Sequence, residues 1–200
     1  MRLELIRLLG LIFMNEEVQI NIEKEFSDLP NGWIVLLETS AEQALQLSLS
    51  TIKYLIDEKN YVGIVVSASR PYKNLAQLYE HKSIDTSRIL FIDSISKSQS
   101  VELEEAGNVL YLDSVSDLTG ISLAVKGSMD KIQGDKFIFI DSITSMLIHN
   151  EPAIFARFVH GILTKMRISG TSGLLISLEK ETDKEIRAEI AQLCDKIVRI

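Results

Sequence analysis

One junction in this chain lies where nucleotide-binding α/β proteins hold a phosphate group. A buried-strand pattern over Ile34–Leu37 passes directly into a helical pattern over residues 41–59. In such proteins the junction carries G-x-x-x-x-G-K-[ST], whose glycines let backbone N–H groups surround the phosphate. This chain has neither glycine nor lysine there, and its junction residues are Glu38, Thr39, Ser40, Ala41 and Glu42. The position suits phosphate, but the residue types do not.

The same junction has the features of a helix start. Two capping boxes fit the S/T-x-x-E/Q pattern, Thr39 with Glu42 or Ser40 with Gln43. Glu38 and Glu42 flank the helix N-terminus, where a carboxylate complements the helix dipole and repels an incoming phosphate. The sequence therefore predicts a capped helix that disfavours a triphosphate.

A second candidate site follows the apolar strand pattern Phe137–Ile140. Asp141 and Ser142 come directly after it, as in a Walker B strand, whose aspartate orients Mg²⁺, usually through water. The same Asp-Ser pair follows two other strand patterns, at Asp93 and Asp113, where turn and helix-cap roles are sufficient. An aspartate after a hydrophobic strand is common, so Asp141 alone is a weak indication of metal binding.

Strand and helix patterns alternate along the chain and must position these residues. Strands are predicted over residues 33–37, 62–67, 88–92, 109–112, 136–140, 173–178 and 196–200. Helices are predicted over residues 41–59, 71–81, 118–132, 152–169 and 183–193, with an apolar turn at 143–148. Several strands are continuous apolar runs, which is typical of strands buried on both faces of a parallel sheet. We expect an α/β fold, a three-layer α/β/α sandwich with a mostly parallel central sheet and right-handed crossovers.

The 200 residues are expected to form a single domain over residues 30–200, preceded by an N-terminal extension, residues 1–29, with an edge strand over Val18–Ile22. The apolar run Leu8–Met14 is too short to span a bilayer. We expect it to be a packing segment, or to precede a true start at Met14 rather than Met1. Membrane contact through residues 1–14 is the less favoured alternative.

Composition restricts the partners and the chemistry. The formal net charge of −7 disfavours nonspecific binding of nucleic acid and anionic lipid. Cys194, the only cysteine, lies in an apolar helical pattern, which predicts a buried thiol in a reducing, cytoplasmic location. The three histidines are far apart, without a second ligand at metal-binding spacing, so no metal site is expected. His160 lies in helix 152–169, whose wide apolar band favours deep packing over a protein interface.

The order of these elements resembles the RecA-like ATPase superfamily, specifically the archaeal KaiC-like proteins grouped as signal-transduction ATPases. The resemblance extends over about Pro30 to Ile200, and its order of elements is more specific than any one motif. The segments that carry it are GWIVLL at 32–37, ILFIDSIS at 89–96, DLTGIS at 117–122, FIDSIT at 139–144 and GLLISLEK at 173–180.

The resemblance implies a P-loop NTPase fold in which residues 38–42 are a degenerate Walker A and Asp141 and Ser142 a vestigial Walker B. It also implies acidic residues after the second core strand, where this chain has Ser69 and Arg70. Neither serves as a general base at neutral pH. We therefore expect no catalytic residue and no cofactor, and a signalling or interaction module that self-associates or binds a protein partner. The alternative is an atypical nucleotide-binding protein or weak ATPase using ATP and Mg²⁺, with Arg70 or Lys73 replacing the missing lysine.

Overall fold

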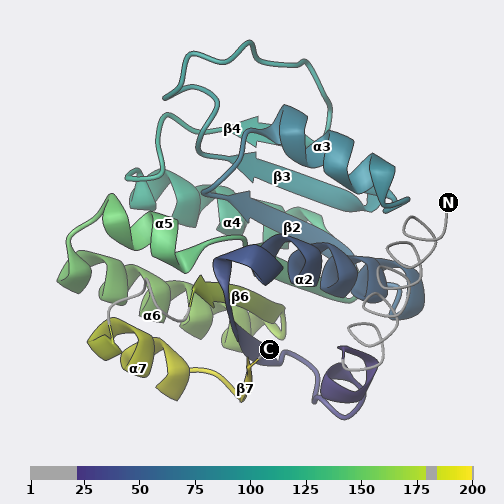
Figure 1. The fold of residues 1–200 in the computed structure, drawn as a ribbon, viewed down its shortest axis with the longest axis vertical. Coiled ribbons are helices and arrows are strands. Elements are labelled where there is room, and N and C mark those ends of the chain that lie inside the picture. The colour runs from purple at the N-terminus through teal and green to yellow at the C-terminus, as the bar shows by residue number, and fades with distance from the viewer. Residues whose placement is uncertain (1–21, 179–183, 200) are drawn as a thin grey trace, which may run out of the picture.

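The computed structural model describes residues 22–178 and 184–199 (Figure 1). These residues form a seven-stranded sheet in the order β4-β3-β2-β5-β6-β1-β7, and every strand pair in it is parallel. The strands are β1 (Ile34–Thr39), β2 (Val62–Ser67), β3 (Ile89–Asp93), β4 (Val109–Tyr111), β5 (Lys136–Ile140), β6 (Ser172–Leu178) and β7 (Lys196–Arg199). The predicted parallel sheet is confirmed.

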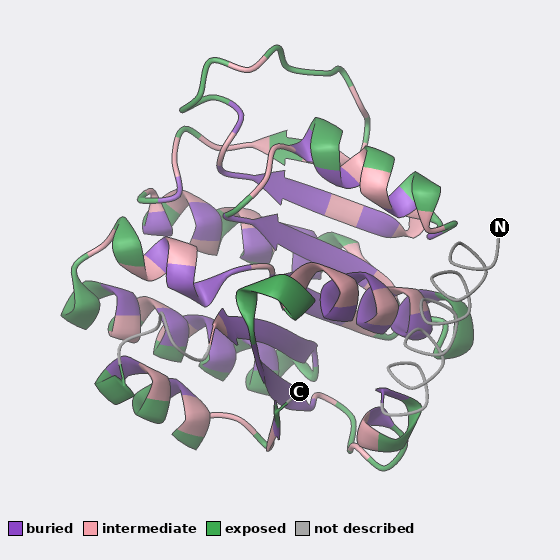
Figure 2. Ribbon diagram, in the orientation of Figure 1, coloured by how far each residue is buried: buried purple, intermediate pink, exposed green. Residues whose placement is uncertain are grey.

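Helices cover both faces of the sheet. On one face lie α2 (Ala41–Lys53), which continues as a π-helical turn over Tyr54–Glu58, and α3 (Tyr72–His81). On the other lie α4 (Leu118–Lys131), α6 (Pro152–Ser169) and α7 (Lys184–Gln192). The strands are buried along most of their length while the helices expose their outer sides (Figure 2). The three-layer sandwich expected from the sequence is therefore the observed architecture.

Strand β1 shows why the central strands lack polar alternation. Its successive side chains point to opposite faces, so Val35 and Leu37 enter the core under α2 while Ile34 and Leu36 enter the core on the other side. All six of its residues are buried. A strand with a core on each side needs apolar residues at every position, which produces a continuous hydrophobic run.

At two neighbouring strands, the helical connections that follow the strands lie on opposite faces of the sheet. β2 and β5 are paired, with Val66 beside Ile140. The chain leaves β2 toward α3 on one face and leaves β5 toward α6 on the other. Open α/β sheets bind their ligands outside the carboxyl ends of the strands at such a change of face. In this fold, residues 67–71 and 141–143 lie there.

The structure differs from the sequence prediction in two segments. Residues 143–148, predicted as a turn, form the short helix α5 (Ile143–Ile148), because the Ser142 hydroxyl accepts a hydrogen bond from the Ser145 N–H and caps it. Of the edge strand predicted over Val18–Ile22, only Ile22 lies within the described residues. It is helical, together with residues 23–26, and buried.

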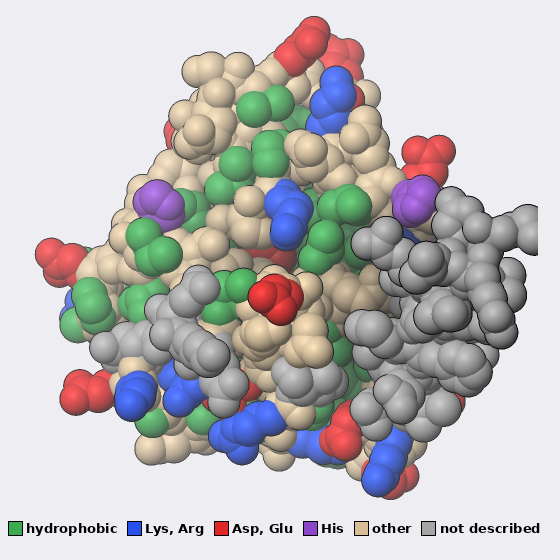
Figure 3. Space-filling view, viewed as in Figure 1, with side chains coloured by type: hydrophobic (Ala, Val, Ile, Leu, Met, Phe, Trp, Pro, Cys, Tyr) green, Lys and Arg blue, Asp and Glu red, His purple; other side chains and the backbone are tan. Residues whose placement is uncertain are grey.

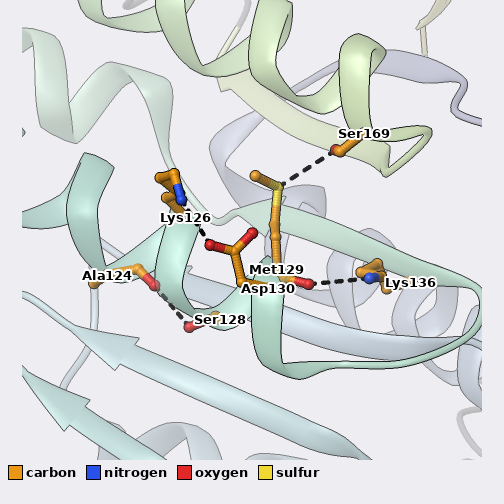
Figure 4. A network of polar contacts seen from close by, with 7 residues as sticks. All are labelled: Ala124, Lys126, Ser128, Met129, Asp130, Lys136 and Ser169. Carbon is orange, nitrogen blue, oxygen red and sulfur yellow. Dashed lines mark hydrogen bonds and ion pairs between the residues drawn. The ribbon is translucent and has the colours of Figure 1, made fainter.

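The link from α4 to β5 is fixed by a lysine at the start of the strand. Lys136 Nζ donates to the carbonyl oxygen of Met129 at 3.0 Å, at the C-terminal end of α4 (Figure 4), and to that of Ile132 at 2.6 Å. A cation there satisfies carbonyls that lack helical partners and complements the helix dipole. The contact sets the entry of β5, and hence the position of Asp141 at its far end.

Candidate functional site

A cavity of about 240 Å³ opens at the carboxyl edge of the sheet, between α2 and α3. It brings together residues from the three segments that the sequence analysis singled out: Ala41 from the start of α2, Ser69 and Arg70 after β2, and Asp141 and Ser142 after β5. Figure 3 shows this face, where hydrophobic side chains are visible in the gap between α2 and α3. The convergence makes this cavity the candidate site.

The Asp141 carboxylate binds the loop that follows β2. Oδ1 accepts a hydrogen bond from Ala68 N–H at 2.7 Å, and Oδ2 accepts one from the Ser69 hydroxyl at 2.6 Å. Two longer bonds to Oδ2 come from the Ser69 N–H (3.3 Å) and the Ser67 hydroxyl (3.2 Å). An ionised carboxylate offers about four acceptor positions, so donors from residues 67–69 occupy them.

Burial raises the pKa of the Asp141 carboxyl above its ordinary value, and the bonds from Ser69, Ala68 and Ser67 act in the opposite direction. Tyr79 lines the same cavity, and burial followed by the charge of Asp141 raises the pKa of its phenol. Burial therefore disfavours ionisation of both groups, and the charge of Asp141 further disfavours ionisation of the Tyr79 phenol.

The cavity does not fit Mg²⁺ and a triphosphate in the way the resemblance implies. Asp141, the one residue of a Walker B type, uses its oxygens for chain donors, and the junction before α2 supplies no lysine. Nowhere in residues 22–178 and 184–199 do three or more His, Cys, Asp or Glu side chains gather in a way that could hold a metal ion.

The start of α2 follows one of the two predicted capping registers. Ser40 is the N-cap, and its hydroxyl contacts Gln43 Oε1 at 3.4 Å. Within the described structure, however, no side chain caps the backbone N–H groups of this first turn, so the predicted capping box is incomplete. Thr39 is buried, and its hydroxyl has no hydrogen-bond partner among the described residues.

Glu38 does not lie beside the phosphate position as expected. It shares the sheet face of Ile34 and Leu36, opposite α2, and its carboxylate pairs with Arg199 Nε at 2.7 Å and with Arg187 Nε at 3.5 Å. The two guanidinium groups compensate its charge. Of the two carboxylates predicted to repel phosphate, only the exposed Glu42 remains in the first turn of α2.

The two basic residues considered as lysine substitutes have different surroundings. Lys73 forms an ion pair with Glu104 at 3.3 Å and does not line the cavity. Arg70 does line it, and among the described residues its guanidinium hydrogen-bonds only to the Ser69 hydroxyl, at 3.5 Å. In the described part of the chain, no carboxylate lies within ion-pair distance of Arg70.

The remaining candidates have structural roles. Asp93 is fully buried and accepts hydrogen bonds from the N–H groups of Ile95, Ser96 and Tyr72, which is the turn and cap role predicted for it. His160 is exposed beside a shallow groove between α6 and α7. Cys194 differs from the prediction of a buried helical thiol, because it follows the end of α7 and is half-buried. Burial still raises the pKa of its thiol to about 12, which makes it a poor nucleophile.

The sequence analysis missed the apolar floor of the cavity, because those residues fit ordinary core patterns. Leu75 and Tyr79 of α3 lie on its buried face, and Phe139 and Ile176 belong to continuous strand runs. These residues line the cavity because α2 and α3 leave a gap above them, and the sequence pattern does not reveal that gap.

Comparisons with known proteins agree with the fold. A model of a family of unknown function, DUF7090, matches residues 16–200. Comparison with curated proteins gave no match. Among the described helices, none has the length and apolar composition needed to cross a membrane.

Two solved structures from the hyperthermophilic archaeon Pyrococcus horikoshii have similar folds. One is a KaiC-like protein, with 14% identity, a TM-score of 0.62, and coverage of 86% of this chain and 72% of the other. The other is an uncharacterised protein in complex with an unknown peptide, with 13% identity, a TM-score of 0.67, and coverage of 90% and 81%. At these identities the likeness establishes a RecA-like, KaiC-like fold.

Proposed function

This chain belongs to the DUF7090 family, and we propose that it is a non-catalytic RecA-like protein that acts through protein–protein contacts. In this proposal residues 38–42 are a degenerate Walker A segment and Asp141 is a vestigial Walker B aspartate. The protein has no nucleotide cofactor, works in the cytoplasm, and either binds a protein partner or self-associates.

The hydrogen bonding of Asp141 carries the proposal. Phosphoryl transfer depends on positioned charges that neutralise the phosphate oxygens. Here the acidic residue that would orient Mg²⁺ accepts bonds from residues 67–69. The neighbouring positions hold Ser69 and Arg70 in place of carboxylates. The site retains the geometry of a strand-end pocket without the groups that perform the chemistry.

Two observations support contact with another protein. Large hydrophobic side chains are exposed on three helices, with 66% of Leu123, 74% of Ile148 and 83% of Ile168 accessible. A structural neighbour of this chain was solved with a peptide bound. We extend peptide or protein binding to this chain by analogy with that neighbour.

Arg70 favours a second candidate function, an atypical nucleotide-binding protein or weak ATPase. A guanidinium without a carboxylate partner, at the edge of a cavity with serine hydroxyls, could contact a phosphate group in place of the missing lysine. This alternative requires ATP and Mg²⁺ to bind without an available Asp141.

Thermal denaturation with and without Mg-ATP separates the two functions. A ligand at 100 times its dissociation constant stabilises a protein by about 2.7 kcal/mol, which raises the Tm measurably. We expect no Tm shift at millimolar Mg-ATP and no phosphate release above the protein-free rate. A Tm increase that disappears in Arg70→Gln but persists in Lys73→Gln would establish the nucleotide-binding alternative instead.

A further inference from the structure

We propose that the cavity between α2 and α3 binds the C-terminal residue of a partner protein, with its free carboxylate at Arg70 and its hydrophobic side chain on the apolar floor. This inference rests on the proposed function and specifies the partner's chemistry. It follows from an anion-binding rim and an apolar floor that lie within one small cavity.

The rim of the cavity offers donors to an anion. Arg70 has no carboxylate partner in the described residues, whereas Arg167, Arg187 and Arg199 each form an ion pair. Ser142 and Ser145 line the same space, where the Ser142 hydroxyl donates to the Ser145 hydroxyl at 2.8 Å, and so does Ala41 at the start of the uncapped helix α2. A guanidinium binds a carboxylate through two parallel hydrogen bonds, and hydroxyls or backbone N–H groups can add to them.

The floor of the cavity is apolar. Five hydrophobic side chains from α2, α3, β5 and β6 line it: Leu45, Leu49, Leu75, Phe139 and Ile176. Four of the five are buried, and they belong to the core beneath α2 and α3. An aliphatic or aromatic side chain of a ligand would therefore be removed from water here, which favours binding in proportion to the apolar area buried.

The size of the cavity selects among anionic ligands. Its volume of about 240 Å³ is below the roughly 300–1,000 Å³ typical of clefts for drug-sized molecules. It is also more enclosed than the groove between α6 and α7, the surface along α3 beyond Arg70, and the hollow beside residues 103–111. An internal Asp or Glu would need room for chain on both sides. A terminal residue carries its carboxylate and its side chain on one Cα atom and needs room for chain on one side only.

Asp141 lies in the same cavity, and its carboxylate, when ionised, repels a nearby ligand carboxylate, so Arg70 and the neutral donors of the rim must offset that repulsion. The Asp141 oxygens accept bonds from Ala68, Ser69 and Ser67, so they face donors of the chain. Beyond Arg70, the surface continues along α3 past Asn74 and Gln77, whose amides can bond to the backbone of an extended peptide. The preceding residues of the partner would follow this surface.

Fluorescence anisotropy with labelled peptides tests the inference. The probes are Gly-Ser-Gly-Ser peptides extended by Leu, Ile, Val or Phe with a free carboxylate, and the same peptides ending in an amide. Two further probes end in a Ser carboxylate or carry an internal Glu before a terminal amide. We expect at least one hydrophobic carboxylate peptide to bind below millimolar concentration, and its amide and Ser-terminated versions to bind at least tenfold more weakly.

Variants of the protein locate the binding site. Arg70→Gln should weaken carboxylate binding at least tenfold and leave the residual amide binding unchanged, whereas the neighbouring Lys73→Gln should change neither. Ala44→Phe, which fills the cavity from α2, should abolish binding while thermal denaturation confirms that the variant folds. Equal binding of amide and carboxylate, preference for the internal Glu peptide, equal effects of Arg70→Gln and Lys73→Gln, or no binding by any hydrophobic terminus would each overturn the inference. The thermal denaturation with Mg-ATP tests the proposed function separately, so failure of the peptide-binding inference can be distinguished from failure of the proposed function.

Discussion

A single carboxylate, Asp141, couples two strand ends, and its surroundings decide its chemistry. An aspartate after a hydrophobic strand can hold a metal, cap a helix or bind a loop, and the sequence pattern is the same in each case. Asp93 and Asp113 follow strands in the same Asp-Ser pattern, yet one is fully buried among backbone N–H groups and the other lies on the surface beside Lys97. The difference arises from the neighbouring strand, which sequence spacing does not reveal.

Replacing Asp141 should destabilise the fold. In Asp141→Asn, an NH2 group replaces one of the two oxygens that accept bonds from residues 67–69, so either the buried Ala68 N–H or the exposed Ser69 hydroxyl loses its acceptor. We expect a loss of about 1–3 kcal/mol in the free energy of unfolding, measured by urea denaturation. Asp113→Asn is the matched control, because its carboxylate is 84% exposed, and it should change stability by less than about 0.5 kcal/mol. Equal effects of the two substitutions would contradict the assigned role.

The raised pKa of Asp141 predicts how this loss depends on pH. Between the ordinary value of 3.8 and the raised value, the native state binds the proton more tightly than the unfolded chain does. The contribution of Asp141 to stability is therefore largest below pH 3.8 and decreases as the pH rises through its folded-state pKa. The stability gap between wild type and Asp141→Asn should narrow over that range and then stay constant. A gap that widens with pH in parallel urea titrations would show that the pKa is lowered instead.

At the scale of elements, Glu38 joins three of them. It is the fifth residue of β1, and its buried carboxylate pairs with Arg187 of α7 and Arg199 of β7. The sequence alone placed it with Glu42, because both flank the same helix start. The alternation of side chains along β1 sends Glu38 to the face opposite α2, where the last helix and strand return to the sheet.

The substitution Glu38→Gln should loosen the attachment of α7 and β7 to β1. Removing one partner from a buried ion pair leaves uncompensated charge, and partial exposure of both arginines reduces the cost to about 1–3 kcal/mol. Glu42→Gln, four residues along and exposed, should change stability by less than about 0.5 kcal/mol. Urea denaturation followed by hydrogen exchange would measure the total loss and show whether α7 and β7 exchange faster. Unchanged exchange in these two elements would refute the role given to Glu38.

At the scale of the whole molecule, the layers and the strand order along the chain could be predicted because both depend on residue type alone. Continuous apolar runs such as Ile64–Val66 identify strands with a core on each side, and alternation with helical patterns implies parallel crossovers. The helix at 143–148 was missed because its cap is one serine hydroxyl and its length is six residues.

The candidate site could be predicted only in part. The convergence of Ala41, Ser69 and Asp141 followed from the resemblance, and the cavity brings those residues together. The bonds from residues 67–69 to Asp141, and the pairing of Glu38 with Arg199, depend on the register of β2 with β5 and of β1 with β7. Register between strands distant in sequence is a tertiary property, so residue spacing could not supply it.

The bonds between Asp141 and residues 67–69 also limit how this protein could acquire hydrolytic activity. Restoring glycine and lysine before α2 would leave Asp141 engaged with the neighbouring loop, while freeing Asp141 alone would expose an unpaired carboxylate and weaken the sheet edge. Neither change alone would therefore supply a working site. In the proposed non-catalytic protein, a route to ATPase activity would require both changes together.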